Sequence, residues 1–418
     1  MKQLGKFSIG VGDRFGKEGA AQISAAVELK KQAGIDVALV WNKSNREHKI
    51  IGTTPADQRK AVDTAIARTG WKGAHFVDAD HIGLGTVDSF LEYCDFYTID
   101  VADFIGKGAD VAAVNAFVEG HRSLIGTISV PGIKEKLNIT EGLLRSTATT
   151  YLSAAKEAAR VYRHVLEKKG EGTFITEVSM DETATPQLPA ELLIVLAALA
   201  DEKIPLRTVA PKFSGRFNKG VEYVGDPQAF LKEFREDVAV VAYGVAHFGL
   251  PADLKLSIHS GSDKFALYRG IGQILRETGA GLHLKTAGTT WLEELVGLAE
   301  AGGEGLNIAK QIYRIAYDRH EELVGPYESV VDIDRARLPK PSEVDAWSGA
   351  DYAAALRHVR SEKRFNPDFR QYLHVSYKVA AELGDTFIGA LEKNRESVER
   401  NVRENLFERH LKPLFMGA

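Results

Sequence analysis

Short runs of apolar and β-branched residues recur along the chain, and stretches in which apolar residues follow a helical period lie between them. Such runs are typical of parallel strands that are buried on both faces. Between the first two runs, Ile23, Val27 and Leu29 keep a helical spacing, and Gly34 follows as a favourable helix stop. We predict strands at residues 7–11, 37–41, 74–77, 96–99, 174–178, 205–209, 254–258 and 282–284.

The alternation of strand and helix patterns indicates consecutive βαβ units, which build a parallel sheet. Eight strands are the number that a closed (β/α)₈ barrel of the TIM type requires. An open, doubly wound α/β sheet is the competing architecture, and we favour the barrel.

The spacing of the strands predicts the domain organisation. Residues 1–302 are expected to form the barrel, with a helical insertion at about 105–172 that contains a long helix at 141–169. The pattern after about residue 303 is helical, with Pro339 and Pro341 marking a linker. We therefore predict a C-terminal helical extension, residues 303–418, that covers the barrel or builds the interface of a homo-oligomer.

Composition excludes several classes of protein. The 418 residues include 53 basic and 57 acidic side chains, so the basic surface that nucleic acids reward is missing. No polybasic patch or long apolar run predicts membrane binding, and the first residues do not resemble a signal peptide. The single cysteine, Cys94, cannot form an intrachain disulfide. We expect a cytoplasmic protein without nucleic-acid or membrane partners.

Ionisable and polar side chains follow almost every predicted strand. In a parallel barrel these positions converge on the C-terminal mouth, where catalysis is found. Polar loops alone would explain one or two of these residues, but not their recurrence, so we predict an enzyme. The residues are Asp13, Arg14, Asn42, Asp78, Asp80, His81, Asp100, Glu177, Asp181, Glu182, Lys212, His259, Ser260, Asp263, His283, Lys285, Thr286, Thr289 and Thr290.

The sequence around the third strand gives the sharpest local signal. Asp80 and His81 place a carboxylate beside an imidazole, which suits a general base next to a metal ligand. Alternatively, Asp80 caps the next helix and His81 lies at the surface.

Two further histidines lie at or near strand ends. His259 precedes a turn of small residues that includes Ser260, and we predict it to be a metal ligand. His283 and Lys285 share one face of the last strand and would supply a third ligand and a cation for a substrate carboxylate. The alternatives are a chance histidine in a turn and a histidine packed in a barrel layer.

Glu177 and Lys212 complete the predicted catalytic set. Glu177 would ligate the metal or remove a proton, and Lys212 would act electrostatically or bind a carboxylate. Asp181 and Glu182 are equally well explained as the cap of the next helix. The segment from Gly10 to Gly16 has the spacing G-x-G-x-x-x-G, one residue off the dinucleotide fingerprint, so we expect no NAD.

Several of these segments resemble the tagaturonate/fructuronate epimerases. The resemblance runs from about residue 7 to 374. The Asp80-His81 pair and the turn at His259 are also similar, more distantly, to the zinc-dependent class II sugar aldolases, and Glu177 and His283 then compete as third ligand. The segments are Gly12-Asp13-Arg14-Phe15, Asp78-Ala79-Asp80-His81, Glu177-Val178-Ser179-Met180-Asp181-Glu182, Ala210-Pro211-Lys212-Phe213, His259-Ser260-Gly261-Ser262-Asp263-Lys264 and His283-Leu284-Lys285-Thr286.

The resemblance implies epimerisation of a ketohexuronate at the hydroxyl carbon β to the ketone. A β carbon cannot be inverted through a simple enolate, so the reaction needs either transient oxidation of the hydroxyl or retro-aldol cleavage. We favour cleavage assisted by a divalent metal. Zinc is the first choice, ahead of manganese or nickel. Asp80 or Glu177 would take the proton and Lys212, Arg14 or Lys285 would bind the carboxylate; Asp13, Asn42, Ser260, Asp263 and Thr286 are further predicted substrate contacts. The alternatives are epimerisation of fructose and tagatose, a class II-type aldolase and a non-catalytic aldolase subunit.

Overall fold

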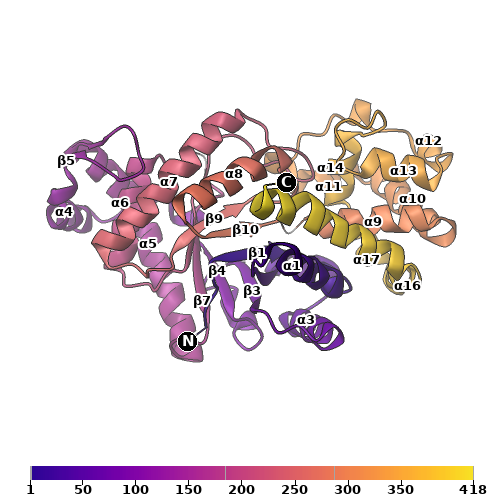
Figure 1. Ribbon diagram of the computed structural model, residues 1–418, viewed down its shortest axis with the longest axis horizontal. Coiled ribbons are helices and arrows are strands. Elements are labelled where there is room, and N and C mark those ends of the chain that lie inside the picture. Colours follow the sequence, from indigo (N-terminus) through magenta and orange to yellow (C-terminus); the bar gives the residue numbers. More distant parts are fainter. Residues whose placement is uncertain (1, 184, 287, 418) are drawn as a thin grey trace.

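The computed structural model describes residues 2–183, 185–286 and 288–417. Within these ranges, eight parallel strands close into a barrel in the order β1-β10-β9-β8-β7-β4-β3-β2 (Figure 1). The predicted barrel is therefore confirmed, and the open sheet is wrong. The strands are β1 (Phe7–Val11), β2 (Ala38–Ser44), β3 (His75–Ile82), β4 (Phe96–Asp100), β7 (Ile175–Ser179), β8 (Thr208–Ala210), β9 (Lys255–His259) and β10 (Leu282–Lys285).

Strand β3 is longer than its apolar run predicts. It continues through the polar residues to Ile82, because Asn42 and Ser44 of β2 pair with Asp78 and Asp80. The register against β4 shifts between Ala79 and Ile82. His81 lies at this irregularity with a φ of 54°, a left-handed conformation that few residues other than glycine adopt. The irregularity therefore determines where the His81 side chain points.

Helices on the outside of the barrel connect the strands. The long helix predicted at 141–169 is α5, and it carries an antiparallel hairpin, β5 (Gly126–Ile128) with β6 (Leu137–Ile139), just before it. Gly34 ends α1 in a left-handed conformation, as predicted. The helices are α1 (Gly19–Ala33), α2 (Asn45–Ile51), α3 (Pro55–Thr69), α4 (Val111–Gly120), α5 (Glu141–Lys169), α6 (Pro189–Asp201), α7 (Pro227–Phe248) and α8 (Phe265–Thr278).

The chain after β10 is helical and forms a second apolar core beside the barrel (Figure 1). This core begins in α9, the helix that directly follows the last strand, so the exact boundary at residue 302 stays a prediction. The helices are α9 (Thr289–Ala301), α10 (Gly303–Asp318), α11 (His320–Val324), α12 (Pro341–Asp345), α13 (Gly349–Leu356), α14 (Pro367–Val375), α15 (Tyr377–Leu383), α16 (Asp385–Lys393) and α17 (Arg395–Glu404).

The last helical segment, η6 (Asn405–Met416), returns to the barrel and packs on its core. Its Phe415 ring lies 4.7 Å from the ring of Phe7 in β1. Gly272 of α8 permits the close approach, because a Cβ there would lie 1.9 Å from the carbonyl oxygen of Leu414. Among the described residues, no helix is both long enough and apolar enough to cross a membrane.

The barrel interior changes from apolar to polar along its axis. At the N-terminal end of the strands, a small separate cluster contains Leu4, Ala38, Val40, Phe76, Phe96 and Ile175. Alternation along each strand places Asp78, Thr98 and Glu177 on the same inward face, closer to the C-terminal mouth. Burying these polar groups is costly unless they are paired, so their position indicates a site rather than a packed core.

Candidate metal centre and active site

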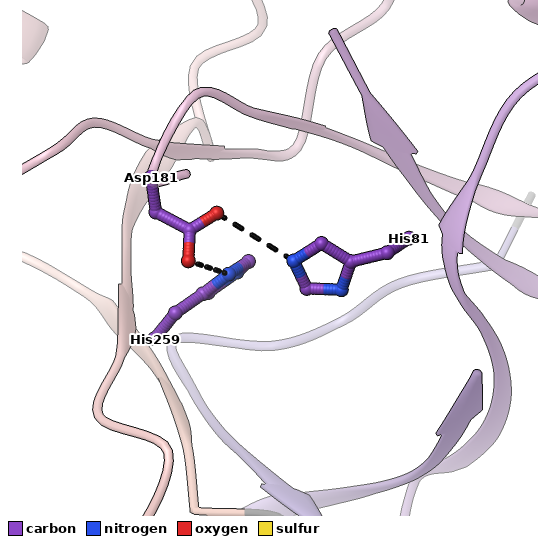
Figure 2. A group of neighbouring side chains, drawn as sticks. All are labelled: His81, Asp181 and His259. Atoms are coloured by element: carbon purple, nitrogen blue, oxygen red, sulfur yellow. Dashed lines mark ion pairs between the residues drawn. The ribbon is translucent and has the colours of Figure 1, made fainter. Parts of the chain in front are cut away.

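Three side chains from distant parts of the chain meet at the C-terminal mouth (Figure 2). His81 comes from β3, His259 ends β9, and Asp181 lies in the turn after β7. The Nε2 atom of His81 is 3.5 Å from Asp181 Oδ1, and the Nδ1 atom of His259 is 3.1 Å from Asp181 Oδ2. One potential ligand atom from each residue lies within 4.8 Å of the other two. We call these three residues the Asp181 cluster.

The chemistry of the Asp181 cluster suits a divalent cation. Two imidazole nitrogens and a carboxylate oxygen are ligands that zinc and similar ions accept, and three protein ligands leave a position open for substrate. The two nitrogens that face Asp181, Nε2 of His81 and Nδ1 of His259, are buried and make no hydrogen bond of good geometry. Buried polar atoms are rarely left in this state, so the cluster could bind a metal ion.

The other nitrogen of each histidine is held by a carboxylate. His81 Nδ1 is 2.9 Å from Asp80 Oδ1, and His259 Nε2 is 2.9 Å from Glu177 Oε1. The Ser179 hydroxyl donates to Asp181. Metal-binding histidines are commonly oriented by such carboxylates, which also make the imidazole a stronger ligand.

Nearby carboxylates offset the effect of burial on the pKa values of His81 and His259. Burial alone would lower the pKa of His81, but Asp80 and Asp181 together raise that pKa well above its usual value. Burial opposes the charge of His259 as well, and Asp181 and Glu177 raise its pKa to about 9. The pKa of Asp181 lies well below its usual value despite burial, because both imidazoles favour its charged form. The protein thus concentrates negative charge here, and a bound cation would compete with protons for the same atoms.

Lys285 lies at the centre of a second set of charges just below the mouth. Its ammonium nitrogen is 2.9 Å from Asp78 Oδ2, 2.8 Å from Asp80 Oδ1 and 3.2 Å from Glu177 Oε1. Burial raises the pKa of Asp78 to about 7, while Lys285 acts in the opposite direction. The charge of Lys285 is therefore already compensated, and it fixes Asp80 and Glu177, the two carboxylates that hold the histidines.

Three predicted substrate contacts lie in the loop after β1 and on β2. Asp13 accepts hydrogen bonds from the backbone of Lys17 and Glu18, at 3.1 and 2.8 Å. Arg14 pairs with Glu47 at 3.0 Å. Asn42 is buried, and neither its amide oxygen nor its amide nitrogen has a hydrogen-bond partner. The side-chain amide of Asn42 could therefore donate a hydrogen bond to a substrate and accept one from it.

The predicted contacts that follow β9 and β10 are bonded within the protein. Ser260 donates its hydroxyl to the backbone oxygen of Lys285 at 2.7 Å, and the Thr286 amide donates to Gly10 at 2.9 Å. The carboxylate of Asp263 is fully buried and accepts a hydrogen bond from Arg370 of α14 at 2.7 Å. These contacts join the barrel loops to one another and to the C-terminal helices.

His283 lies inside the barrel, outside the Asp181 cluster. Its Nδ1 atom is 2.9 Å from the hydroxyl of Ser8, and its ring is 5.3 Å from that of Phe96. Burial lowers its pKa to about 3. Lys212 follows β8 and is half-buried, and its backbone amide donates to Gln187 at 2.7 Å. The structure therefore brings His81 and His259 together but leaves His283 and Lys212 out of the cluster.

Asp181 is the member of the cluster that sequence reasoning did not select. The alternative of a helix cap does not hold, because α6 begins only at Pro189. The available signal was its position two residues beyond the end of β7, close in sequence to Glu177 and Ser179.

Comparisons with known proteins find similarity to tagaturonate epimerases. A family model described as tagaturonate epimerase matches residues 2–414. The tagaturonate/fructuronate epimerase of Thermotoga maritima is 27% identical over 419 residues, which cover 97% of this chain and 80% of that protein.

Solved structures share the fold. A glycerol-complexed crystal structure of the fructuronate-tagaturonate epimerase UxaE from Cohnella laeviribosi aligns with a TM-score of 0.80 at 24% identity, covering 98% of this chain and 81% of that one. Its native crystal structure gives a TM-score of 0.77 at 24% identity, covering 99% and 82%. Because the family model spans nearly the whole chain, the protein belongs to the tagaturonate epimerase family.

Proposed function

We propose that the chain interconverts tagaturonate and fructuronate by inverting the hydroxyl-bearing carbon β to the ketone. Membership of the tagaturonate epimerase family and the name of the Thermotoga maritima relative support the substrate. The observation that carries the chemistry is the Asp181 cluster, in which two buried imidazole nitrogens and one carboxylate face a common point.

The proposal includes a divalent metal held by His81, Asp181 and His259. Asp181 then takes the third position that the sequence left between Glu177 and His283. Zinc suits this ligand set best, with manganese and nickel as alternatives. When bound, the ion would act as a Lewis acid toward the ketone and the adjacent hydroxyl of the substrate.

Asp80 and Glu177 are the proposed proton acceptors. Asp80 has a pKa below its usual range, because Lys285 and His81 outweigh the effect of its burial. Lys285 and His259 likewise outweigh the burial of Glu177 and keep its pKa well below the usual value. Both groups are therefore ionised at neutral pH, as a general base must be, and each is held by Lys285 within 3.2 Å.

The proposed route is retro-aldol cleavage followed by aldol addition. The base removes the proton of the β-hydroxyl, the neighbouring C–C bond breaks, and its electron pair passes to the half that carries the ketone. The new aldehyde turns to present its other face, and the same bond forms again with the proton returned to oxygen. No atom or electron is gained or lost, so the route needs no nicotinamide. Fructose and tagatose have the same carbon arrangement and are proposed as additional substrates.

The test is to incubate the purified protein with tagaturonate and to follow fructuronate by NMR. Stripping the protein with a chelator should abolish conversion, and zinc, manganese or nickel should restore it. Under the retro-aldol route in D₂O, the hydrogen on the inverted carbon stays unexchanged, because its C–H bond never breaks. Accumulation of trapped aldehyde would instead indicate an aldolase. Conversion that is unaffected by chelation would contradict the metal.

A further inference from the structure

Three cations, Lys219, Arg14 and Arg46, act on one another where the barrel meets the C-terminal helices, and they outnumber their acidic partners. Lys219 belongs to the loop between β8 and α7, and this loop is fixed on both sides. The Lys219 amide donates to the carbonyl of Val330 at 2.8 Å, and the next amide, Gly220, donates to the hydroxyl of Ser262 at 2.8 Å. Arg370 donates to the Gly220 carbonyl at 2.7 Å. The backbone that carries Lys219 is therefore held by both the barrel and the C-terminal helices.

The other two cations rest on aromatic rings. The Arg14 guanidinium lies 3.8 Å from the ring centre of Tyr377, and the Arg46 guanidinium lies 4.8 Å from that of Tyr327. The hydroxyl groups of the two tyrosines are 2.9 Å apart. Such stacking fixes a guanidinium and leaves its N–H edge for other partners. Arg14 already uses two of its N–H groups, because Nε donates to Glu47 at 3.0 Å and Nη1 donates to the carbonyl of His374 at 3.2 Å.

With Lys219 itself included, positively charged side chains outnumber negatively charged ones in this group. The charges that act most strongly on the half-buried Lys219 are the guanidinium groups of Arg14 and Arg46 and the carboxylates of Glu47 and Glu182. Burial lowers the pKa of Lys219, and the two arginines lower it further. Glu47 pairs with Arg14. In the part of the chain that the structure describes, neither Lys219 nor Arg46 forms an ion pair within 4.0 Å.

Two neighbouring residues, Glu182 and His374, connect these positive charges with the Asp181 cluster and the C-terminal helices. Glu182, which directly follows Asp181, is one of the charges that act on Lys219. The imidazole of His374, buried and without a partner for either nitrogen, has its pKa lowered by burial and then by Arg14 and Lys219. Arg14 donates to the carbonyl of His374 at 3.2 Å, and a Cβ at Gly220 would lie 3.5 Å from the Cβ of His374. Arg14 and the loop that carries Lys219 therefore meet at His374.

We propose that Lys219, assisted by Arg46 and Arg14, binds the carboxylate of a ketohexuronate and so selects acidic over neutral sugars. This inference rests on the proposed function, because it assumes that the opposite end of the sugar lies at the Asp181 cluster. Lys285, the cation that the sequence predicted for this task, already contacts three carboxylates. A carboxylate supplies the missing counter-charge, whereas the CH₂OH group of a neutral ketohexose does not.

The experiment compares Lys219→Met with the wild type, using tagaturonate and tagatose, which differ only at the carboxylate. A charge-assisted hydrogen bond in such a site is worth roughly a tenfold to hundredfold change in binding. Lys219→Met should weaken tagaturonate binding and raise its KM by about this factor, with little change in tagatose binding. Lys219→Arg should recover most of the loss. Arg216→Met removes an exposed cation from the same loop and should change nothing.

Binding by calorimetry and turnover by NMR separate the two proposals. If the wild type binds tagaturonate through Lys219 but does not convert it, the proposed function fails and the carboxylate site stands. If the wild type converts tagaturonate and Lys219→Met keeps binding and KM within about twofold, the carboxylate site is overturned. If tagatose binding falls as much as tagaturonate binding, Lys219 has a structural role and the inference is also overturned. Absence of both binding and turnover in the wild type overturns both proposals.

Discussion

Two regions of this molecule use the same residue types for different ends. In the Asp181 cluster, one carboxylate lies between His81 and His259. In a second group, which we call the Asp263 cluster, one buried carboxylate lies 3.2 Å from His358 Nδ1 and 3.4 Å from His410 Nε2. Each is a carboxylate with two imidazoles, built from segments that are distant in the chain.

An arginine makes the difference. Arg370 is fully buried, donates to Asp263 at 2.7 Å and also donates to the carbonyl of Leu356 at 2.8 Å. The pKa of Asp263 is well below its usual value although burial opposes this, and Arg370 is the largest favourable cause. No guanidinium pairs with Asp181 among the described residues, so its charge is balanced only by histidines. A cation built into the protein makes one cluster structural, and the lack of one leaves the other available to a metal.

The largest effect is expected for His259→Ala. Removing this imidazole should cost metal affinity by more than the roughly 10- to 100-fold that follows loss of an outer partner. Epimerisation should fall by about a thousandfold or more, because a Lewis acid supplies several kcal/mol at the transition state. Metal content by plasma mass spectrometry and conversion by NMR measure the two effects. His358→Ala is the matched control in the Asp263 cluster and should keep its metal. A metal-free His358→Ala protein would break the comparison.

Arg370→Met should mainly affect folding. It leaves Asp263 buried without its guanidinium, which typically costs about 3–5 kcal/mol of unfolding free energy. Urea unfolding measures the loss, and the metal content of the folded fraction should stay that of the wild type. Arg314→Met, which breaks an exposed pair with Asp345, should cost about 1 kcal/mol or less. Equal losses in the two variants would show that the Asp263 cluster contributes little.

The smallest effect concerns acid stability. Burial lowers the pKa of His410 to about 4, although Asp263 acts in the opposite direction. Arg409 and Lys264 act in the same direction as burial. As the pH falls below about 6.5, His410 binds a proton in the unfolded chain. In the folded chain it binds this proton only near pH 4. The free energy of unfolding therefore declines between these two pH values. The decline attributable to His410 is roughly 3 kcal/mol.

His410→Gln removes the titrating group, and its midpoint of urea unfolding should therefore depend less on pH between about 6.5 and 4. His247→Gln, at an exposed position, should follow the wild type. A His410→Gln curve parallel to that of the wild type would show that other groups cause the decline.

The barrel and the meeting of His81 with His259 could be predicted from the sequence for one reason. A closed parallel barrel sends every strand end to the same mouth, so residues at strand ends become neighbours whatever their separation in the chain. The apolar runs located those ends to within a few residues, except in β3, where pairing with β2 carries the strand through Asp78 and Asp80.

The remaining contacts depend on features that no local pattern contains. Asp181 lies in a turn, where the direction of a side chain is not fixed by strand alternation. Arg370 reaches Asp263 from α14, His358 from the segment that follows α13, and His410 from η6. The sequences of these segments contain no pattern that points to Asp263. Lys219 was missed for the same reason, since its neighbours Arg14 and Arg46 follow other strands. Tertiary packing, rather than strand order, decides these positions.

The return of η6 to the barrel has a consequence for how the protein is made. Leu406, Leu411 and Leu414 belong to the same apolar core as the strands, and their partners on α1 and α8 are synthesised much earlier. A nascent chain on the ribosome therefore exposes an apolar strip along α1 and α8 until η6 emerges and covers it. During that interval the exposed strip can bind chaperones or cause aggregation, so the barrel cannot be completed before η6 has been synthesised.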